Sequence, residues 1–214
     1  MSNPIQRIAI YSKAQRISHW LVAAGSIFLL ISAWLIQHSD LDILAWTDWH
    51  IMVGQALSVV LAFRIYLLFK PGSGHWRLLI PTREQRHILL QTIKFYASLG
   101  RLPCPDWYAF NPLWQPLYLL LITILLVTTI TGYLIGSALF FAGLSMTQLH
   151  GVFATLVLYF SLVHPVFSVI HDIKGQGAQI SAMLNGYKYF QSKAVDKPPA
   201  QADNSVSLQS LLKK

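Results

Sequence analysis

Four apolar stretches, each about 20 residues long, dominate the sequence. They cover residues 19–37, 49–69, 116–140 and 146–170. An α-helix rises about 1.5 Å per residue, so each stretch can cross the roughly 30 Å hydrocarbon core of a bilayer. Only 11% of the 214 residues are charged, far fewer than in soluble domains. We therefore predict an all-α membrane protein, a bundle of four transmembrane helices in one domain covering residues 1–190.

The positive charges lie between these stretches, and their distribution predicts the orientation of the chain. Lys and Arg number three before the first stretch, six in the connection 70–115 and six from residue 174 onward, whereas the other two connections contain none. Cytoplasmic loops are enriched in Lys and Arg, so we expect both termini and the 70–115 connection to be cytoplasmic. This topology explains the net charge of +8 without any role for nucleic acid.

The 70–115 connection contains a candidate amphipathic helix at residues 83–99. Its larger apolar residues fall towards one side, namely Ile88, Leu89, Ile93 and Tyr96. We expect this helix to lie on the cytoplasmic membrane surface, or to serve as a docking surface.

Two further segments are predicted to carry little chemistry. The tail, residues 191–214, is polar and rich in Lys, Ala, Ser and Pro, a composition typical of disorder. The single cysteine, Cys104, excludes an internal disulfide and is interpreted as an inert loop thiol.

Four histidines lie in or at the mouths of the apolar stretches, and the topology gives each a depth. His19 opens the first stretch from the cytoplasm, whereas His50 and His150 open the second and fourth from outside. His164 follows His150 by 14 residues, which returns it to within about 40° of the same helix face and about 21 Å further along the axis. Depth therefore pairs His50 with His150 near the outside, and His19 with His164 near the cytoplasm.

An imidazole inside a membrane needs a partner, which makes these histidines candidates for function. Two imidazoles from different helices at one level can ligate a haem iron from both sides. We therefore predict two haem b groups, one for each pair. Zinc, which needs about four clustered ligands, fits two separate pairs poorly. His171, seven residues beyond His164, is the competing ligand on that helix, although we expect it to reach the headgroups.

Arg64 lies inside the second stretch, 14 residues beyond His50, so it faces the same way in the cytoplasmic half. An intramembrane guanidinium needs an anion, and no Asp or Glu lies in any of the four stretches. A propionate of the cytoplasmic-side haem is the partner we predict; snorkelling of Arg64 to the interface is the alternative.

Several of these residues resemble the motifs of a known family. The relevant features are Arg16-Ile17-Ser18-His19-Trp20, His50 at the entrance of the second stretch, and the spacing of His150 and His164. In these features the chain resembles the membrane di-haem cytochrome b subunits of formate dehydrogenases, thiosulfate reductases and nickel–iron hydrogenases. Bacterial cytochrome b561 proteins share that fold. The resemblance covers residues 5–190 and implies that these four histidines are the haem ligands.

Two more segments refine the resemblance. Phe110-Asn111 and the following Gln115 are similar to a Tyr-Asn…Gln motif of the formate dehydrogenase and thiosulfate reductase branches, where the Asn lies near the quinone. This implies a site for menaquinone or ubiquinone at Asn111 and Gln115, although a Phe replaces the Tyr. The Ser-x-Met-Leu-x-Gly pattern at residues 181–186 resembles the tail of hydrogenase cytochromes, which slightly favours the hydrogenase branch.

The resemblance implies an electron-transfer subunit of the bacterial inner membrane. Electrons would pass between the quinone pool and an iron–sulfur subunit, whose catalytic partner is of the hydrogenase or molybdenum oxidoreductase type. Quinone reduction or oxidation would then occur on this chain. A stand-alone cytochrome b561-type quinone oxidoreductase with a small redox substrate is the alternative. A haem-free anchor or transporter is a third reading, which the lack of a convincing repeat disfavours.

Overall fold

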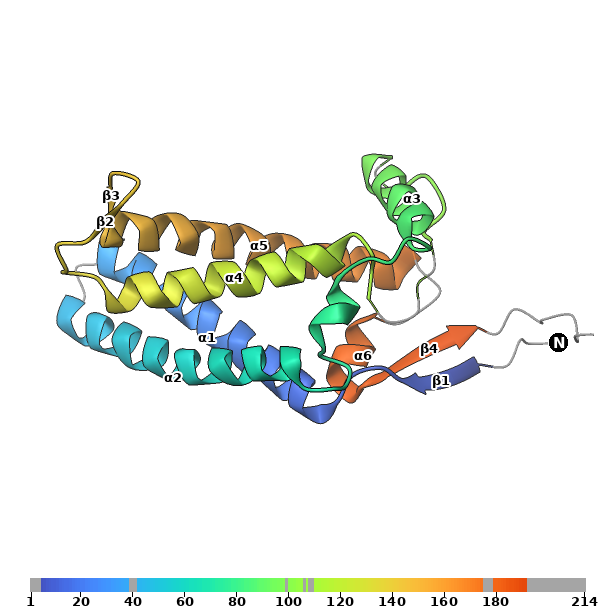
Figure 1. Cartoon of the computed structure of the whole chain (residues 1–214), viewed down its shortest axis with the longest axis horizontal. Coiled ribbons are helices and arrows are strands. Elements are labelled where there is room, and N and C mark those ends of the chain that lie inside the picture. Colours follow the sequence, from blue (N-terminus) through green and yellow to red (C-terminus); the bar gives the residue numbers. More distant parts are fainter. Residues whose placement is uncertain are drawn as a thin grey trace, which may run out of the picture.

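The computed structural model describes residues 5–38, 42–98, 100–105, 107, 110–174 and 179–191. Its long helices form the elongated bundle in Figure 1: α1 (Lys13–His38), α2 (Ile43–Phe69), α4 (Trp114–Tyr133) and α5 (Met146–Lys174). Each is long and apolar enough to cross a membrane, and only 6 to 11% of its most apolar segment is buried within the bundle. The four-helix membrane fold predicted from the sequence is thus confirmed, with most apolar side chains facing outward.

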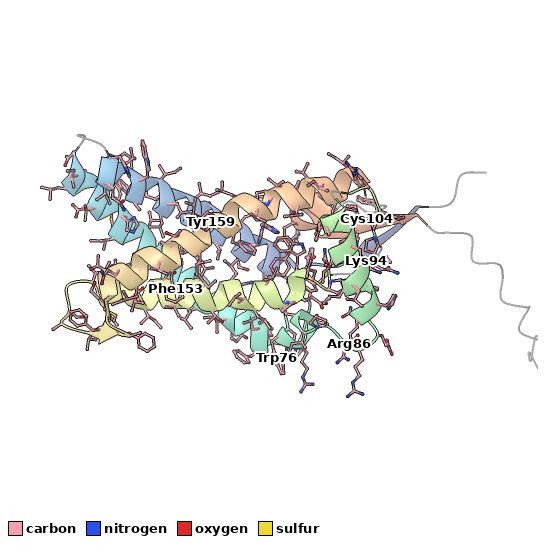
Figure 2. The ribbon with its side chains drawn as sticks, turned by 90° about the horizontal axis from the view of Figure 1, so that it is seen from above. Trp76, Arg86, Lys94, Cys104, Phe153 and Tyr159 are labelled. Atoms are coloured by element: carbon pink, nitrogen blue, oxygen red, sulfur yellow. The ribbon has the colours of Figure 1, made fainter. Side chains whose placement is uncertain are left out.

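The two ends of the bundle are built differently (Figure 1). One end carries β1 (Ile5–Ala9), η1 (Trp76–Leu79), α3 (Arg86–Ala97), α6 (Gln179–Asn185) and β4 (Tyr187–Gln191). The other end carries the last residues of α1, the first residues of α2 and a hairpin of β2 (Phe140–Phe141) and β3 (Leu144–Ser145). We call them the basic end and the hairpin end. Figure 2 shows Arg86, Lys94 and Cys104 together at the basic end.

An apolar cluster in the middle of the bundle joins all four helices. Leu61, Leu125 and Val157 are buried there, from α2, α4 and α5 in turn. Val22 and Leu30 of α1 pack against them. A second cluster, of Leu68, Leu79 and Phe110, attaches the 70–113 connection to the basic end.

The third membrane helix is shorter than the predicted stretch 116–140, because α4 ends at Tyr133. Gly136 then adopts a φ of +84°, which directs the chain out of the helix. The following residues form the hairpin, in which Phe140 pairs with Ser145. Residues 134–140 are as apolar as the helix before them, so an apolar count alone could not detect its end.

Strand pairing between distant segments is a second departure from the all-α prediction. β1 runs antiparallel to β4, with Ile5 opposite Gln191. Gln191, predicted to open the disordered tail, is therefore the last residue of a strand, and residues 192–214 lie outside the described part of the chain. Neither strand alternates strictly between apolar and polar residues, so one sequence carries no clear strand signal there.

The segment 181–186 is hydrogen-bonded to the start of α1 and to the residues just before it. Trp20 donates a hydrogen bond from Nε1 to the Met183 carbonyl at 3.2 Å, and Arg16 donates from Nη1 to the Leu184 carbonyl. The Gly186 carbonyl accepts from the backbone N–H of Ile10 at 2.9 Å. The hydrogenase-like pattern thus lies where it supports the helix that carries His19.

Helix α3 lies within the predicted range 83–99, and it packs on the protein through a different side from the one predicted to be apolar. Thr92 and Phe95 are buried, whereas Ile93, assigned to the apolar side, is 43% exposed. The contact of α3 with the membrane surface stays a prediction.

A substitution at Gly186 tests how much the contacts between the segment 181–186 and the start of α1 contribute to the stability of the protein. Gly186 has a φ of +90°, and an added Cβ would lie 2.9 Å from the Tyr11 carbonyl oxygen. Gly186→Ala should therefore combine backbone strain of about 1–2 kcal/mol with a steric clash. Gly136→Ala is the matched control, because Gly136 also has a positive φ but nothing within 4 Å of an added Cβ. We expect Gly186→Ala to lower the Tm of the protein in detergent more than Gly136→Ala does. Equal falls in Tm would contradict this role of the segment 181–186.

Candidate functional site

At the hairpin end, α2 and α5 bring His50 and His150 together. Their ring centroids are 6.3 Å apart, and the ring planes meet at 74°. Nδ1 of His150 lies 2.9 Å from the Thr128 carbonyl oxygen of α4. Nδ1 of His50 lies 2.8 Å from Oγ of Ser32, a fully buried residue of α1. All four membrane helices thus contribute to this pair.

These contacts determine which nitrogen of each neutral ring carries the proton. A carbonyl oxygen only accepts, so Nδ1 of His150 donates to Thr128. The Ser32 hydroxyl donates its own proton to the Leu29 carbonyl at 3.1 Å, so it accepts from Nδ1 of His50. Both rings are left with an unprotonated Nε2. Neither neutral ring can donate to the other, but both can bind a metal ion.

Gly132 of α4 makes room for His150. A Cβ at this position would lie 3.1 Å from Cε1 of the His150 ring and 3.2 Å from Nδ1. The absence of a side chain at this position thus lets a histidine of the candidate site approach α4 closely.

At the basic end, α1 and α5 bring His19 and His164 together, with ring centroids 6.2 Å apart and planes at 72°. Phe160 stacks on His164 at 5.4 Å with an angle of 13° between the rings. Trp114 and Tyr118 of α4 each present a ring 5.9 Å from His164. Within the described residues, the ring nitrogens of this pair have no hydrogen bond, so aromatic packing alone orients His164.

A cavity of about 380 Å³ lies beside this second pair. His19, His164 and Asn111 line it, together with mostly apolar and aromatic side chains of α1, α4 and α5. Its size and apolar lining are typical of small-molecule and cofactor sites.

Arg64 lies near the same pair, and one nitrogen of its guanidinium group lacks a partner. Its Nη1 is buried and, within the described residues, has no hydrogen-bond partner. Its charge acts on His19 and on Tyr11, which lines the cavity. Burial raises the pKa of Tyr11 to about 12, against the lowering effect of Arg64. The phenol is therefore neutral at physiological pH and gives Arg64 no anion.

The two residues assigned to a quinone differ in position. Asn111 is buried and lines the cavity; its Oδ1 accepts from the Leu113 N–H at 3.0 Å, and its Nδ2 donates to the Tyr96 hydroxyl at 3.3 Å. Gln115 is buried as well, but it does not line the cavity, and its Oε1 has no hydrogen-bond partner among the described residues.

His171, expected to reach the headgroups, is instead buried under the connection before α4. Its Nε2 lies 2.5 Å from the Tyr96 hydroxyl, and its Nδ1 lies 3.2 Å from Sγ of Cys104. Burial raises the pKa of Tyr96, so its protonated hydroxyl donates to His171. Because both ring nitrogens are engaged, His171 is unsuited to bind iron. Cys104, interpreted as an inert loop thiol, is a partner of this histidine.

Residues 10–186 match the prokaryotic cytochrome b561 family. The chain belongs to this family. It is 26% identical over 218 residues to a probable Ni/Fe-hydrogenase B-type cytochrome subunit of Bradyrhizobium diazoefficiens, with 86% of this chain and 87% of that protein covered. No solved structure matches the chain. Membership of a prokaryotic cytochrome b family, together with the four apolar helices, makes it a multi-pass membrane protein that carries electrons and implies haem b as its cofactor.

The histidine pairs of this cytochrome b561 homologue fit a haem iron. A metal–imidazole bond is about 2 Å, and the ring centre lies about 1 Å beyond the nitrogen, so two rings that face each other across one metal ion would have centroids about 6 Å apart. The observed separations of 6.2 and 6.3 Å agree with this value. Among the described residues, no three His, Cys, Asp or Glu side chains gather into another metal site.

Three residues of the site escaped the sequence analysis: Ser32, Thr128 and Tyr11. Hydroxyl residues are common in membrane helices, and Thr128 acts through its backbone, so neither stands out in a sequence. Tyr11 precedes the first apolar stretch and meets Arg64 only after α1 and α2 have packed together.

A valine at Gly132 should disturb the pair at the hairpin end. The added side chain would push the His150 ring away from the Thr128 carbonyl, because Cβ alone already lies 3.1 Å from the ring. We expect Gly132→Val to lower the haem b content per chain, measured by the reduced-minus-oxidised absorbance of the purified protein. Gly151→Val is the control, since an added Cβ there meets nothing within 4 Å. Equal haem content in both variants would count against this role for Gly132.

Proposed function

We propose that the chain is the membrane subunit of a respiratory oxidoreductase, with two haem b groups that connect an iron–sulfur partner to the quinone pool. The observation that carries the proposal is the presence of two histidine pairs at opposite ends of the bundle, each with the ring separation that one iron requires. The hydrogenase cytochrome that the chain resembles over most of its length supports a hydrogenase as the catalytic partner.

The charge distribution supports a basic end in the cytoplasm of a bacterial inner membrane. In the part of the chain that the structure describes, Lys and Arg of both terminal segments and of the long connection gather there, and the sequence places none in the two connections at the hairpin end. An electron that enters at the hairpin end then moves inward against the membrane potential, at about 2.3 kcal/mol per 100 mV. The quinone couple must therefore lie sufficiently above the donor.

The chain's part is to hold, orient and shield the cofactors. When bound, haem b supplies one-electron chemistry. His50 and His150 would hold one haem, oriented through Ser32 and Thr128; His19 and His164 would hold the other, within the aromatic lining of the cavity. Two imidazoles on each iron leave no open position, so activation of a small molecule at iron is disfavoured.

Arg64 supports a haem near the cytoplasm. A buried guanidinium nitrogen without a partner is costly, and the neighbouring Tyr11 is neutral. A propionate would satisfy this charge by a charge-assisted hydrogen bond.

A quinone would bind beside this cavity at the basic end, next to the haem. Asn111 shares that cavity with His19 and His164, which would allow direct electron exchange, and protons would come from the cytoplasm. Gln115, one helical turn further along α4, is proposed as the second polar group because its buried Oε1 is unsatisfied.

Isolation of the chain from its native membrane with its bound proteins tests the assignment as a subunit. A stoichiometric complex with iron–sulfur and hydrogenase catalytic subunits is expected. A lone chain that exchanges electrons between quinone and a small redox compound would instead identify a stand-alone cytochrome b561-type oxidoreductase.

Single histidine variants should remove one haem at a time. His50→Ala or His150→Ala should lose the haem at the hairpin end, and His19→Ala or His164→Ala the one at the basic end, halving the pyridine haemochrome yield per chain. His171→Ala is the control and should keep both, because both its ring nitrogens already have partners. Two haems in His164→Ala but one in His171→Ala would contradict the assignment.

Replacement of Asn111 should separate quinone turnover from haem binding. Asn111→Ala is expected to lower the rate of electron exchange with a quinone analogue at least tenfold while both haem spectra persist. Tyr96→Phe is the control, because it removes the partner of the Asn111 amide but leaves the amide itself. The same loss in both variants would mean that Asn111 acts only by supporting the fold.

A further inference from the structure

The two histidine pairs are oriented by different means, and this difference has consequences for electron transfer. At the hairpin end, both Nδ1–H groups are hydrogen-bonded, one to a carbonyl oxygen and one to a buried hydroxyl. At the basic end, the described residues give neither His19 nor His164 a ring hydrogen bond, and His164 is held by the stacked Phe160.

A hydrogen bond from Nδ1–H makes an imidazole a stronger donor at Nε2. A stronger donor stabilises ferric more than ferrous iron, which lowers the reduction potential of the haem. Among the described residues, no contact at the basic end has this effect, and the positive charge of Arg64, which acts on His19, favours the arrival of an electron. The hydrogen bonds at the hairpin end and the charge of Arg64 at the basic end both make the reduction potential at the hairpin end the lower of the two.

We propose that Ser32 is a positioning residue that, through its hydrogen bond to His50, lowers the reduction potential of the haem at the hairpin end below that of the haem at the basic end. The inference rests on the proposed binding of two haems. The difference between the two reduction potentials then favours transfer of one electron from the hairpin end to the basic end. It partly offsets the opposing membrane potential. No proton accompanies it, because the Nδ1 protons stay on His50 and His150.

The position of Ser32 suits this role. Its side chain is completely buried, its proton is committed to the Leu29 carbonyl, and the lone pair that remains meets His50 at 2.8 Å. The Leu29 carbonyl also interacts with the His50 ring, so the ring keeps one acceptor when the hydroxyl is removed. Substitution of Ser32 should therefore change the potential without loss of the haem.

A redox titration of the purified holoprotein, followed in the haem absorbance bands, tests the proposal. His150→Ala identifies which midpoint belongs to the haem at the hairpin end. In the wild type this midpoint should be the lower one. Ser32→Ala should raise it and increase the ratio of reduced to oxidised haem several-fold at a fixed potential; a tenfold change corresponds to about 59 mV. The midpoint at the basic end should not move.

Three further variants separate the hydrogen bond from packing. Ser32→Cys fills the same space with a weaker acceptor and should also raise the midpoint, whereas Ser32→Thr keeps the hydroxyl and should restore the wild-type value. Ser58→Ala is the matched control: Ser58 also donates to a carbonyl of its own helix, Gln55 at 2.6 Å, but no described contact joins it to a histidine. It should leave both midpoints in place.

Several results would overturn the proposal. They are an unchanged midpoint in both Ser32→Ala and Ser32→Cys, equal shifts at both haems, or a wild-type protein whose haem at the hairpin end has the higher potential. Loss of that haem from both variants would make Ser32 a residue that retains the cofactor, which also contradicts a tuning role. A wild-type protein with two haems and any of these results would leave the proposed function intact; a protein without two haems would remove its basis.

Discussion

Polar groups inside a membrane have to find their partners within the protein, because lipid offers none. Within the described residues, the bundle meets this requirement at two of the four imidazoles. His50 and His150 are hydrogen-bonded to Ser32 and to the Thr128 carbonyl, so this one histidine pair contacts all four membrane helices. The apolar residues between the two pairs only need to fill space, whereas the histidines fix the depth and rotation of the helices.

The two ends of the bundle solve different problems. The hairpin end is closed by two short connections, and its histidine pair is satisfied largely by the helices themselves. The basic end is covered by segments from both ends of the domain and by the long connection, which enclose a cavity around the second pair. Under the proposed function, the basic end would suit exchange with a small molecule, and the hairpin end, which carries fewer elements, would receive the protein partner.

The parts of the structure that follow from helical periodicity were predictable from one sequence. The 14-residue spacing of His150 and His164, together with the alternation of the spans, predicts which histidines share a level. Contacts made by irregular backbone were not predictable. His171 looked exposed because it lies near the end of an apolar stretch, but the chain around Cys104 folds back over it. The pairing of β1 with β4 depends on segments almost the whole domain apart in sequence.

The buried polar atoms that lack hydrogen-bond partners also differ between the two ends of the bundle. Nη1 of Arg64, Oγ of Ser26 and Oε1 of Gln115 are buried at or near the basic end, and none has a hydrogen-bond partner among the described residues. Each such group costs about 1–3 kcal/mol, and more when it is charged. The neighbouring Tyr11 phenol is neutral and therefore offers Arg64 no opposite charge. Under the proposed function, a bound group with acidic and polar functions would lower this cost, so ligands would stabilise the basic end more than the hairpin end, where Ser32 and Thr128 already accept hydrogen bonds from the histidines.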